Sequence, residues 1–299
     1  MLTQLDTLFD IPNVQNYFFD MYGVLWNGKQ LYDGVDDVLM LLRQQGKKVY
    51  ILTNQTALQQ AFVETRQKQG LICGVHYDDV ITSGDVCLQA FQDGICEQVT
   101  QKNDYRLFVL GLSNPALTNA VSSHLTDNPD EADIFYISSL YGDTFQTLEQ
   151  VFIPVMQKGL EKNLPIICAN PDVYVMHGND KILAQGAAAK WYQELGGCVY
   201  FFGKPEGITF QYALKRTQST VSNSVMVGDM LMTDILGANG VGMPTVLVTQ
   251  TGMTDYDMRS QHLSLTDFIT QQAHQENKPV TLLTPTYVLP QVGKAFQNK

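Results

Sequence analysis

The stretch Tyr17-Phe18-Phe19-Asp20-Met21-Tyr22-Gly23 decides the fold of this chain, because a run of three aromatic residues ends abruptly at an acid and a nearby glycine. This pattern predicts a buried strand over 17–19 that leads into a loop at Asp20. The next segment places Val35, Val38, Leu39 and Leu42 at the i, i+3, i+4, i+7 spacing of an amphipathic helix. A strand followed by such a helix predicts the first part of a βαβ unit.

The same alternation continues along the chain. The apolar run Val49–Leu52 predicts a second strand that stops at Thr53-Asn54, and Val80-Ile81 predicts a third. Strands are also expected at 107–112, 134–138, 165–169, 199–202, 224–227 and 245–248, and helices at 145–160 and 182–195. The strand at 199–202 and the two after it are expected to return to the first sheet. Strands that alternate with helices form parallel sheets, so the sequence predicts an α/β fold.

The composition narrows the class of protein. Of the 299 residues 44% are apolar, and the formal net charge is −11, which favours a folded core and disfavours nucleic-acid binding. No apolar run approaches the ~18 residues of a spanning helix, and the first ten residues do not resemble an export signal. The five scattered cysteines form no Cys-x-x-Cys pair, which is typical of reduced thiols. We therefore expect a cytoplasmic protein that binds neither nucleic acid nor membrane.

Polar residues follow several of the expected strands, at the edge where open α/β sheets bind ligands. They are Asp20, Thr53, Asn54, Lys204 and Asp229, and Asp234 follows five residues after Asp229. Three carboxylates at one edge require a cation, and oxygen ligands without nearby histidine or cysteine favour Mg²⁺. A nucleophilic carboxylate, a lysine for phosphate oxygens and this metal together suit phosphoryl transfer through an aspartyl-phosphate.

These residues fall into four ordered motifs. Asp20–Trp26, Leu52–Asn54, Gly203–Pro205 and Gly228–Asp234 resemble motifs one to four of the haloacid dehalogenase-like hydrolases. The resemblance is to the class IIA branch, which includes nucleotide monophosphatases and the 4-nitrophenyl phosphate, pyridoxal phosphate and phosphoglycolate phosphatases. Asn170-Pro171-Asp172 is a further mark of that class, and the resemblance spans nearly the whole chain.

The resemblance implies a Rossmann-like core with a parallel sheet and an inserted α/β cap. We expect residues 1–84 and 196–299 to form the core, and residues 85–195 to form the cap that determines substrate specificity. The implied activity is that of a hydrolase acting on a small phosphorylated metabolite, of the nucleotide or sugar phosphate class. We also expect a homodimer formed through the cap, as occurs among relatives.

The resemblance also implies roles for individual residues. Asp20 would attack phosphorus, with Tyr22 and Lys204 as the other catalytic residues. The residues implied to hold Mg²⁺ are Asp20, Tyr22 through its carbonyl, Asp229 and Asp234. The residues implied to hold the phosphoryl group are Thr53, Asn54 and Lys204. Asp172 would face the substrate from the cap, and the alternative, an Asx turn beside Pro171, explains this residue nearly as well.

Tyr22 is the main departure from the family pattern. The family's phosphatases carry an acid at this position, which protonates the leaving group and later activates water, whereas a phenol is a poor base at neutral pH. Tyr22 is therefore interpreted as a hydrophobic wall, as a substitute acid, or as neither. Two alternatives to an efficient phosphatase follow: a phosphate-ligand binding or regulatory protein with weak turnover, and a metal-free dehalogenase, whose motif one also carries a tyrosine. Asp229, Asp234 and the long insert favour the phosphatase over the dehalogenase.

Overall fold

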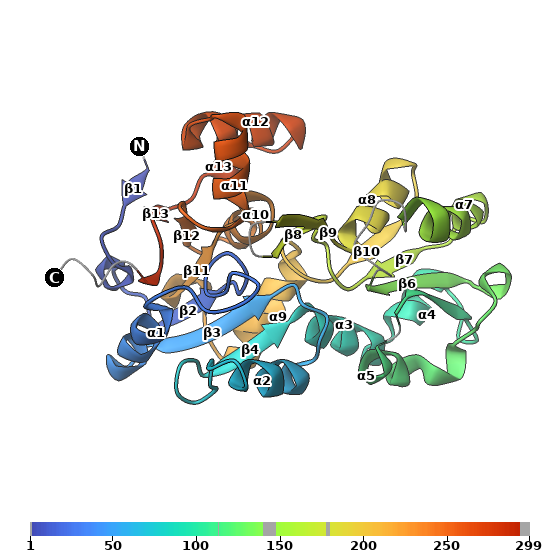
Figure 1. Ribbon diagram of the computed structural model, residues 1–299. Coiled ribbons are helices and arrows are strands. Elements are labelled where there is room, and N and C mark those ends of the chain that lie inside the picture. Colours follow the sequence, from blue (N-terminus) through green and yellow to red (C-terminus); the bar gives the residue numbers. More distant parts are fainter. Residues whose placement is uncertain (1, 113, 140–147, 178–179, 294–299) are drawn as a thin grey trace.

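The computed structural model describes residues 2–112, 114–139, 148–177 and 180–293. Its strands form two parallel sheets and one antiparallel hairpin (Figure 1). The large sheet runs in the order β1 (Thr3–Gln4), β13 (Tyr287–Leu289), β12 (Thr245–Val248), β11 (Ser224–Gly228), β2 (Asn16–Phe19), β3 (Lys48–Thr53) and β4 (Asp79–Thr82). The small sheet runs in the order β10 (Val199–Phe201), β7 (Ile166–Cys168), β6 (Ile134–Ser139) and β5 (Leu107–Gly111). The hairpin pairs β8 (Tyr174–His177) with β9 (Asp180–Leu183). The predicted α/β fold with a parallel sheet is confirmed.

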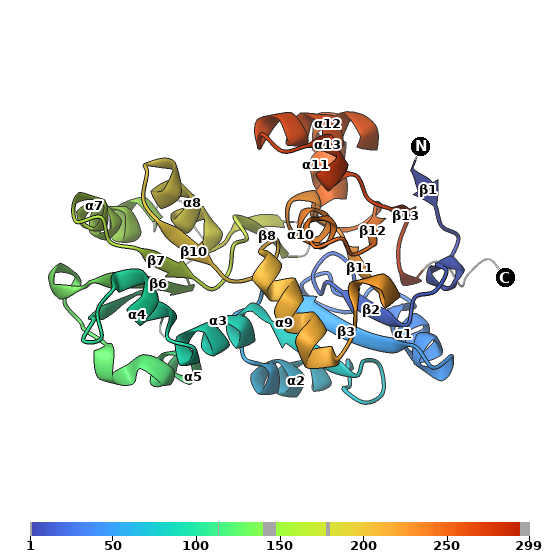
Figure 2. The ribbon, with the colours of Figure 1, turned by 180° about the vertical axis from the view of Figure 1, so that it is seen from behind.

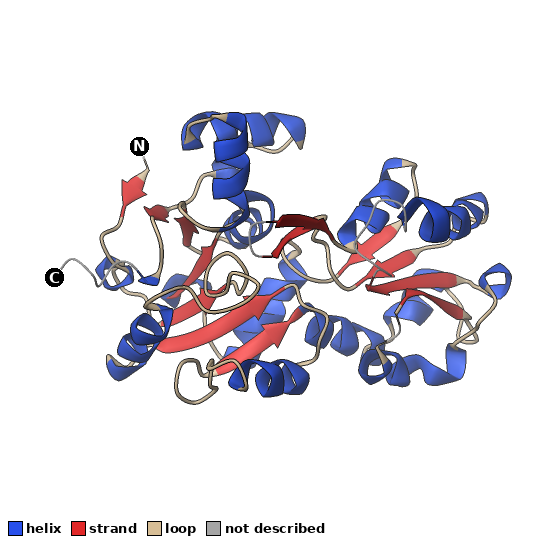
Figure 3. Cartoon of the chain, viewed as in Figure 1, coloured by secondary structure: helices blue, strands red, loops and turns tan. Residues whose placement is uncertain are grey.

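Helices connect these strands and cover both sheets (Figure 3). The α-helices of the described residues are α1 (Val35–Gln44), α2 (Gln59–Gln67), α3 (Ser83–Gln92), α4 (Ile95–Thr100), α5 (Pro115–Thr118), α7 (Ile153–Glu161), α8 (Gly186–Glu194), α9 (Gly207–Thr217), α10 (Leu236–Gly240), α11 (Gly252–Gln261), α12 (Leu265–Gln275) and α13 (Val280–Leu283). Short 3-10 turns lie at Leu8–Asp10, Asn119–His124, Pro129–Glu131 and Val221–Asn223, and π turns at Leu148–Phe152 and Leu231–Ile235. None of the helices in the described part of the chain is long and apolar enough to span a membrane.

The aromatic run of β2 is explained by burial on both faces of the large sheet. Tyr17 and Phe19 belong to a cluster with Val35 and Leu39 of α1. Phe18 points the other way, because successive side chains of a strand alternate, and belongs to a cluster with Phe210 of α9. Figure 2 shows α9 lying across the back of this sheet.

One continuous hydrophobic cluster joins the two sheets. It contains Phe18 and Ile81 of the large sheet, Tyr136 and Ile167 of the small sheet, and Cys87 of the intervening α3. We refer to the chain from β5 to β10, which carries the small sheet and the hairpin, as the insert. The insert is therefore packed directly against the rest of the protein, and it does not hang on a linker.

The expectation that Val199–Phe202 returns to the first sheet is wrong. β10 pairs in parallel with β7, with Tyr200 opposite Ile167, and so forms the edge of the small sheet. An apolar strand fits either sheet, and the pairing is fixed by contacts that the local sequence does not contain. The division into residues 1–84 with 196–299 and residues 85–195 stays a prediction, but β10 favours a second boundary after Phe201 over one at 195.

Two helix predictions also need comment. The helix expected over 182–195 is partly wrong, because Ile182 and Leu183 lie in the hairpin strand β9 and α8 begins only at Gly186. The beginning of the helix expected over 145–160 lies outside the described residues. From Leu148 onward a π turn leads into α7.

Candidate active site

The carboxyl ends of three neighbouring strands bring the predicted site residues together. Asp20 follows β2, Thr53 ends β3, and Asp229 follows β11, and these strands are adjacent and parallel in the large sheet. The main-chain N–H of Asp20 donates to the Val227 carbonyl at 2.9 Å, which extends the β2–β11 pairing up to the catalytic candidate. Lys204 reaches the same edge from the loop between β10 and α9.

Lys204 links two of the carboxylates. Its Nζ donates to Asp20 Oδ1 at 2.5 Å and to Asp234 Oδ1 at 2.6 Å. The Lys204 side chain is only 2% exposed and that of Asp234 1%, whereas that of Asp20 is 13% exposed. Asp20 is therefore the most exposed member of this trio.

Asp229 and Asp234 are held by main-chain groups. Asp234 Oδ2 accepts from the N–H groups of Asp229 and Met230, both at 3.1 Å. Asp229 Oδ2 accepts from the N–H of Met253 at 2.6 Å, but its buried Oδ1 has no hydrogen-bond partner among the described residues. A buried carboxylate oxygen without a partner is costly, and a cation bound beside Oδ1 would remove that cost.

The pKa values of Asp20, Asp229 and Lys204 are set mainly by burial and by the charges of these groups and Asp234. Burial raises the pKa of Asp20 to about 7, against the lowering effect of Lys204. Burial, followed by the charges of Asp20 and Asp234, raises the pKa of Asp229 well above its ordinary value. Burial lowers the pKa of Lys204, but the two carboxylates that it contacts outweigh this effect and raise it. The lysine therefore stays charged, while the carboxylates carry more negative charge than one lysine can balance.

The site fits a divalent cation. One oxygen each from Asp20, Asp229 and Asp234 lies within 4.8 Å of the others, and an all-oxygen donor set of this kind suits Mg²⁺. Two glycines preserve the space around Asp229: Gly23 and Gly252 both have positive φ, and a Cβ at either position would collide with the Asp229 carboxylate. Thr251 Oγ1 fixes the loop by donating to the Gly23 carbonyl at 2.6 Å.

Asn54 joins the site to the insert. Its Oδ1 accepts from the Lys204 N–H at 2.6 Å, while its Nδ2 donates to the Lys204 carbonyl at 2.9 Å and to Asp172 Oδ1 at 2.8 Å. Asn170 makes the Asx turn, because its Oδ1 accepts from the Asp172 N–H at 2.9 Å. The Asp172 carboxyl is thus free to line the cavity, and burial raises its pKa to about 6, against the lowering effects of Asn54 and Lys204.

Tyr22 is held firmly by polar partners. Its hydroxyl oxygen accepts from Gln55 Nε2 at 3.0 Å and from Arg66 Nη2 at 3.1 Å. The Thr53 hydroxyl accepts only a long bond of 3.4 Å from the Gln55 N–H. Among the described residues, the hydroxyl protons of Tyr22 and Thr53 have no recorded acceptor, so both groups have a proton to donate to a ligand.

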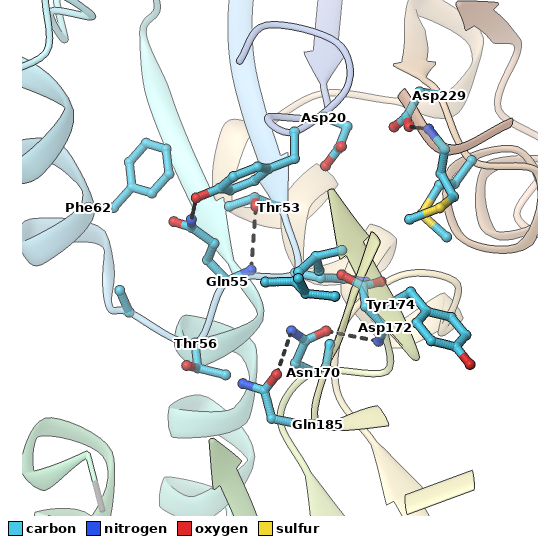
Figure 4. Close-up of a pocket in the computed structure, with 18 of the residues that line it drawn as sticks. Asp20, Thr53, Gln55, Thr56, Phe62, Asn170, Asp172, Tyr174, Gln185 and Asp229 are labelled. Atoms are coloured by element: carbon cyan, nitrogen blue, oxygen red, sulfur yellow. Dashed lines mark hydrogen bonds between the residues drawn. The ribbon is translucent and has the colours of Figure 1, made fainter. Parts of the chain in front are cut away.

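A cavity of about 490 Å³ opens in front of these groups. Figure 4 shows Asp20 and Asp229 at its upper edge, Phe62 and Thr56 on one side, and Asn170 and Gln185 below. The hairpin contributes further wall residues, among them Tyr174, Val175, Ile182 and Leu183. The cavity therefore lies between the edge of the large sheet and the insert.

The structure brings together the site residues predicted from the sequence and adds residues that were not predicted. The structure brings together Asp20, Tyr22, Thr53, Asn54, Asp172, Lys204, Asp229 and Asp234. The sequence did not point to Gln55 and Arg66, which hold Tyr22, or to the hairpin. Phe62 and Arg66, which lie at i and i+4, are the buried residues of α2, and this burial is visible only in the structure.

Comparisons with known proteins agree with this geometry. Residues 17–121 match the family described as haloacid dehalogenase-like hydrolase, and residues 201–294 match a second family described as HAD-hydrolase-like. An acid sugar phosphatase from Staphylococcus haemolyticus is 26% identical over 249 residues, which cover 83% of this chain and 89% of that protein. A haloacid dehalogenase-like hydrolase from Brucella suis has a TM-score of 0.77 at 25% identity, covering 98% of this chain and 100% of its own. NagD from E. coli has the same fold, with a TM-score of 0.61 at 19% identity over 94% of this chain and 98% of its own.

The parallel sheet with a carboxylate cluster and a buried lysine at its edge is typical of hydrolases with a Rossmann-like α/β core. The two family matches and the Brucella structure make the assignment definite: the chain belongs to the haloacid dehalogenase-like hydrolases. The resemblance stated from the four motifs is thereby confirmed.

Proposed function

We propose that this hydrolase is a Mg²⁺-dependent phosphatase that cleaves small phosphate monoesters through an aspartyl-phosphate on Asp20. The observation that carries the proposal is the partly exposed Asp20 carboxylate, tied to buried Lys204 beside Asp229, whose Oδ1 has no partner. The relatives named acid sugar phosphatases support the sugar phosphate class over the nucleotide class.

Asp20 is oriented for attack. Because Lys204 occupies Oδ1, the other oxygen, Oδ2, is the one that attacks phosphorus. The bond from Oδ2 to phosphorus forms as the bond from phosphorus to the ester oxygen breaks. Thr53 and Lys204 hold the phosphoryl oxygens, and Asn54 fixes the Lys204 main chain for this task.

Tyr22 serves the leaving group. Both lone pairs of its hydroxyl oxygen are occupied by Gln55 and Arg66, so its proton is directed away from them. That proton goes to the departing ester oxygen. Water then attacks phosphorus of the aspartyl-phosphate, returns a proton to Tyr22 and releases inorganic phosphate, which restores the Asp20 carboxylate.

Mg²⁺ would be held by Asp20, Asp229 and the Tyr22 carbonyl, with Asp234 supporting the site through its bonds to the Asp229 and Met230 N–H groups. When bound, the metal supplies positive charge that stabilises the negative charge developing on the phosphoryl oxygens. The insert excludes bulk water from the reaction, since the hairpin forms one wall of the cavity.

The test is phosphate release from a panel of sugar phosphates, nucleotides and 4-nitrophenyl phosphate, with Mg²⁺ or with chelator. We expect release with Mg²⁺, none with chelator, and at least a ~10³-fold lower kcat in Asp20→Asn. Unchanged hydrolysis in Asp20→Asn would overturn the proposal. Halide release from a 2-haloacid without metal would favour the dehalogenase, and Mg²⁺ binding without hydrolysis of any phosphate would favour the binding protein.

A further inference from the structure

Arg66 is a buried cation without a carboxylate partner in the described part of the chain. The residue is 6% exposed, and none of the ion pairs that the described residues form includes it. Its guanidinium carbon lies 5.6, 5.0 and 5.3 Å from the ring centroids of Tyr22, Trp26 and Phe62. Aromatic faces stabilise a buried cation, but they do not neutralise its charge.

The hydrogen bonds of Arg66 are also incomplete. Nη1 donates to Gln69 Oε1 at 2.7 Å and Nη2 donates to Tyr22 Oη at 3.1 Å, while the buried Nε has no partner in the part of the chain that the structure describes. A guanidinium carries five N–H donors, so most of them are not used by the described residues. A group with this much unused donor capacity and an unbalanced charge is suited to binding an anion.

Arg66 lies in the wall of the cavity that Asp20 faces. It is the one Lys or Arg side chain among the described residues that line this cavity, whereas Asp20, Asp172 and Asp229 line it as acids. Tyr22 follows Asp20 by two residues, and its hydroxyl accepts from Arg66. Because Tyr22 is proposed to serve the leaving group, Arg66 would lie near the part of the cavity that holds the rest of the substrate.

We propose that Arg66 forms a second anion subsite, so that the preferred substrates are phosphate monoesters whose alcohol part carries a carboxylate or a second phosphate. This inference rests on the proposed phosphatase function and adds the chemical class of the leaving group. The phosphoryl group occupies the Asp20 end of the cavity, and the second anion accepts the unused N–H donors of Arg66. Among the described residues that line the cavity there is no Lys, no His and no second Arg, so Arg66 is the cation available to such an anion.

The test uses two substrates that differ in one group. 3-Phosphoglycerate carries a carboxylate where glycerol 3-phosphate carries a hydroxymethyl group, and the remaining atoms are the same. We expect the wild-type protein to show a kcat/KM at least ~10-fold higher for 3-phosphoglycerate than for glycerol 3-phosphate. This preference would oppose the long-range repulsion between the more anionic substrate and the protein, whose net charge is −11. Equal values, or a preference for glycerol 3-phosphate, would overturn the subsite.

Variants of Arg66 then test whether this residue causes the preference for 3-phosphoglycerate. Arg66 also donates to the Tyr22 hydroxyl, so replacing Arg66 disturbs Tyr22 and lowers kcat/KM for both substrates alike. The ratio of the two kcat/KM values cancels this common effect. We expect Arg66→Gln to bring the ratio to about 1 and Arg66→Lys to retain part of it. The matched control is Arg216→Gln, since Arg216 pairs with Asp79 and does not line the cavity. A wild-type ratio retained in Arg66→Gln would overturn the assignment.

The two proposals fail in different ways. If neither substrate nor 4-nitrophenyl phosphate is cleaved, the phosphatase function is wrong. If they are cleaved without discrimination, only the Arg66 subsite is wrong. If Arg66→Gln does not fold, the wild-type comparison of the two substrates still decides whether an anion is preferred.

Discussion

Tyr22 is the residue at which the sequence predicts a departure from the family pattern, and the structure gives its hydroxyl a defined setting. Its hydroxyl oxygen accepts from two different side chains, Gln55 and Arg66, which leaves the hydroxyl proton available to a ligand. We expect this proton to be donated in the reaction.

Replacing Tyr22 by Phe tests this role. The variant keeps the ring and the main-chain carbonyl but removes the proton, so we expect kcat to fall by about 10²-fold while Mg²⁺ affinity stays unchanged. Steady-state kinetics and a Mg²⁺ titration measure the two effects. An unchanged kcat would show that the hydroxyl takes no part.

Replacing Tyr22 by Asp introduces the acid that the motif resemblance predicts for the family's phosphatases, and it separates the phosphatase from the binding protein. We expect hydrolysis to fall, because Gln55 and Arg66 are arranged to donate to a phenol oxygen and would pair with a carboxylate and hold it ionised. A large gain in kcat would instead identify a degenerate enzyme, in agreement with the binding-protein hypothesis.

The raised pKa of Asp20 predicts how stability depends on pH without metal. Its pKa rises from an ordinary 3.8 to about 7, so its stabilising contribution is fully present below pH 3.8 and is lost as pH rises through about 7. With chelator present, we expect the wild-type free energy of unfolding to increase from pH 8.5 to pH 6.5, by at most about 1.4 kcal/mol per pH unit for this carboxyl.

Chemical denaturation at both pH values, with Asp20→Asn as the reference, isolates the effect of Asp20. The variant lacks the titrating group, so its free energy of unfolding is expected to change less over the same interval. We also expect Mg²⁺ to stabilise the wild type more at pH 8.5 than at pH 6.5, since protons compete with the metal. Parallel pH profiles for the two proteins would contradict the assigned shift.

At the scale of single elements, the loops after β2 and β12 are shaped to leave room for Asp229. Gly252→Ala places a methyl group against the Asp229 carboxylate and forces a side chain into a positive φ of 78°. We expect Mg²⁺ binding to weaken at least ~10-fold, with loss of activity. Calorimetric Mg²⁺ titration of the folded variant measures this.

Gly70→Ala is the matched control, because Gly70 has a similar φ of 88° and no atom within 4 Å of the added methyl group. It carries the backbone strain alone, which costs about 1 kcal/mol of stability. We expect its Mg²⁺ affinity to equal that of the wild type. Equal Mg²⁺ affinity in Gly252→Ala and Gly70→Ala would show that the close approach to Asp229 is irrelevant.

Prediction from the sequence succeeded where the signal is local. The strand ends at Asp20, Thr53 and Asp229 could be found because a short apolar run followed by a polar residue is visible in the chain, and parallel strands bring such ends together. Arg66 and Gln55 could not be assigned, since their role depends on the distance from α2 and its preceding loop to Tyr22. That distance is a property of packing.

The same reason explains the errors in the fold. β10 reads as an apolar strand, and nothing in Val199–Phe201 distinguishes pairing with β7 from pairing in the large sheet. The hairpin was missed because β8 and β9 are short and polar in part, and Ile182 and Leu183 match a helical spacing with α8. Tertiary contacts decided both cases.

At the scale of the whole molecule, the insert is tied to the rest of the protein by charge as well as by the shared hydrophobic cluster. Lys181 of β9 pairs with Asp257 of α11 at 2.9 Å, and Lys190 of α8 pairs with Glu276 at 3.2 Å. Both pairs cross from the insert to the large-sheet half, and both are partly exposed. They hold the insert in the arrangement in which hairpin residues line the cavity.

Removing both lysine charges tests this arrangement. We expect Lys181→Gln with Lys190→Gln to raise KM about 2- to 5-fold and to leave kcat nearly unchanged, because each exposed pair contributes about 0–1 kcal/mol. Steady-state kinetics at low and high salt measure the effect, and salt should raise the wild-type KM in the same direction. The control is Lys158→Gln, whose partner Asp130 lies within the insert. A KM equal to that of the control would contradict a role in closure.

Trapping the covalent intermediate tests the central claim most directly. Wild-type protein is mixed with Mg²⁺ and 4-nitrophenyl phosphate, quenched rapidly with borohydride, and mapped by peptide mass spectrometry. Borohydride reduces an acyl phosphate to an alcohol, so an aspartyl-phosphate on Asp20 becomes homoserine at position 20. We expect this residue in the wild type and not in Asp20→Asn. Homoserine at another aspartate, or none at all while phosphate is being released, would contradict Asp20 as the nucleophile.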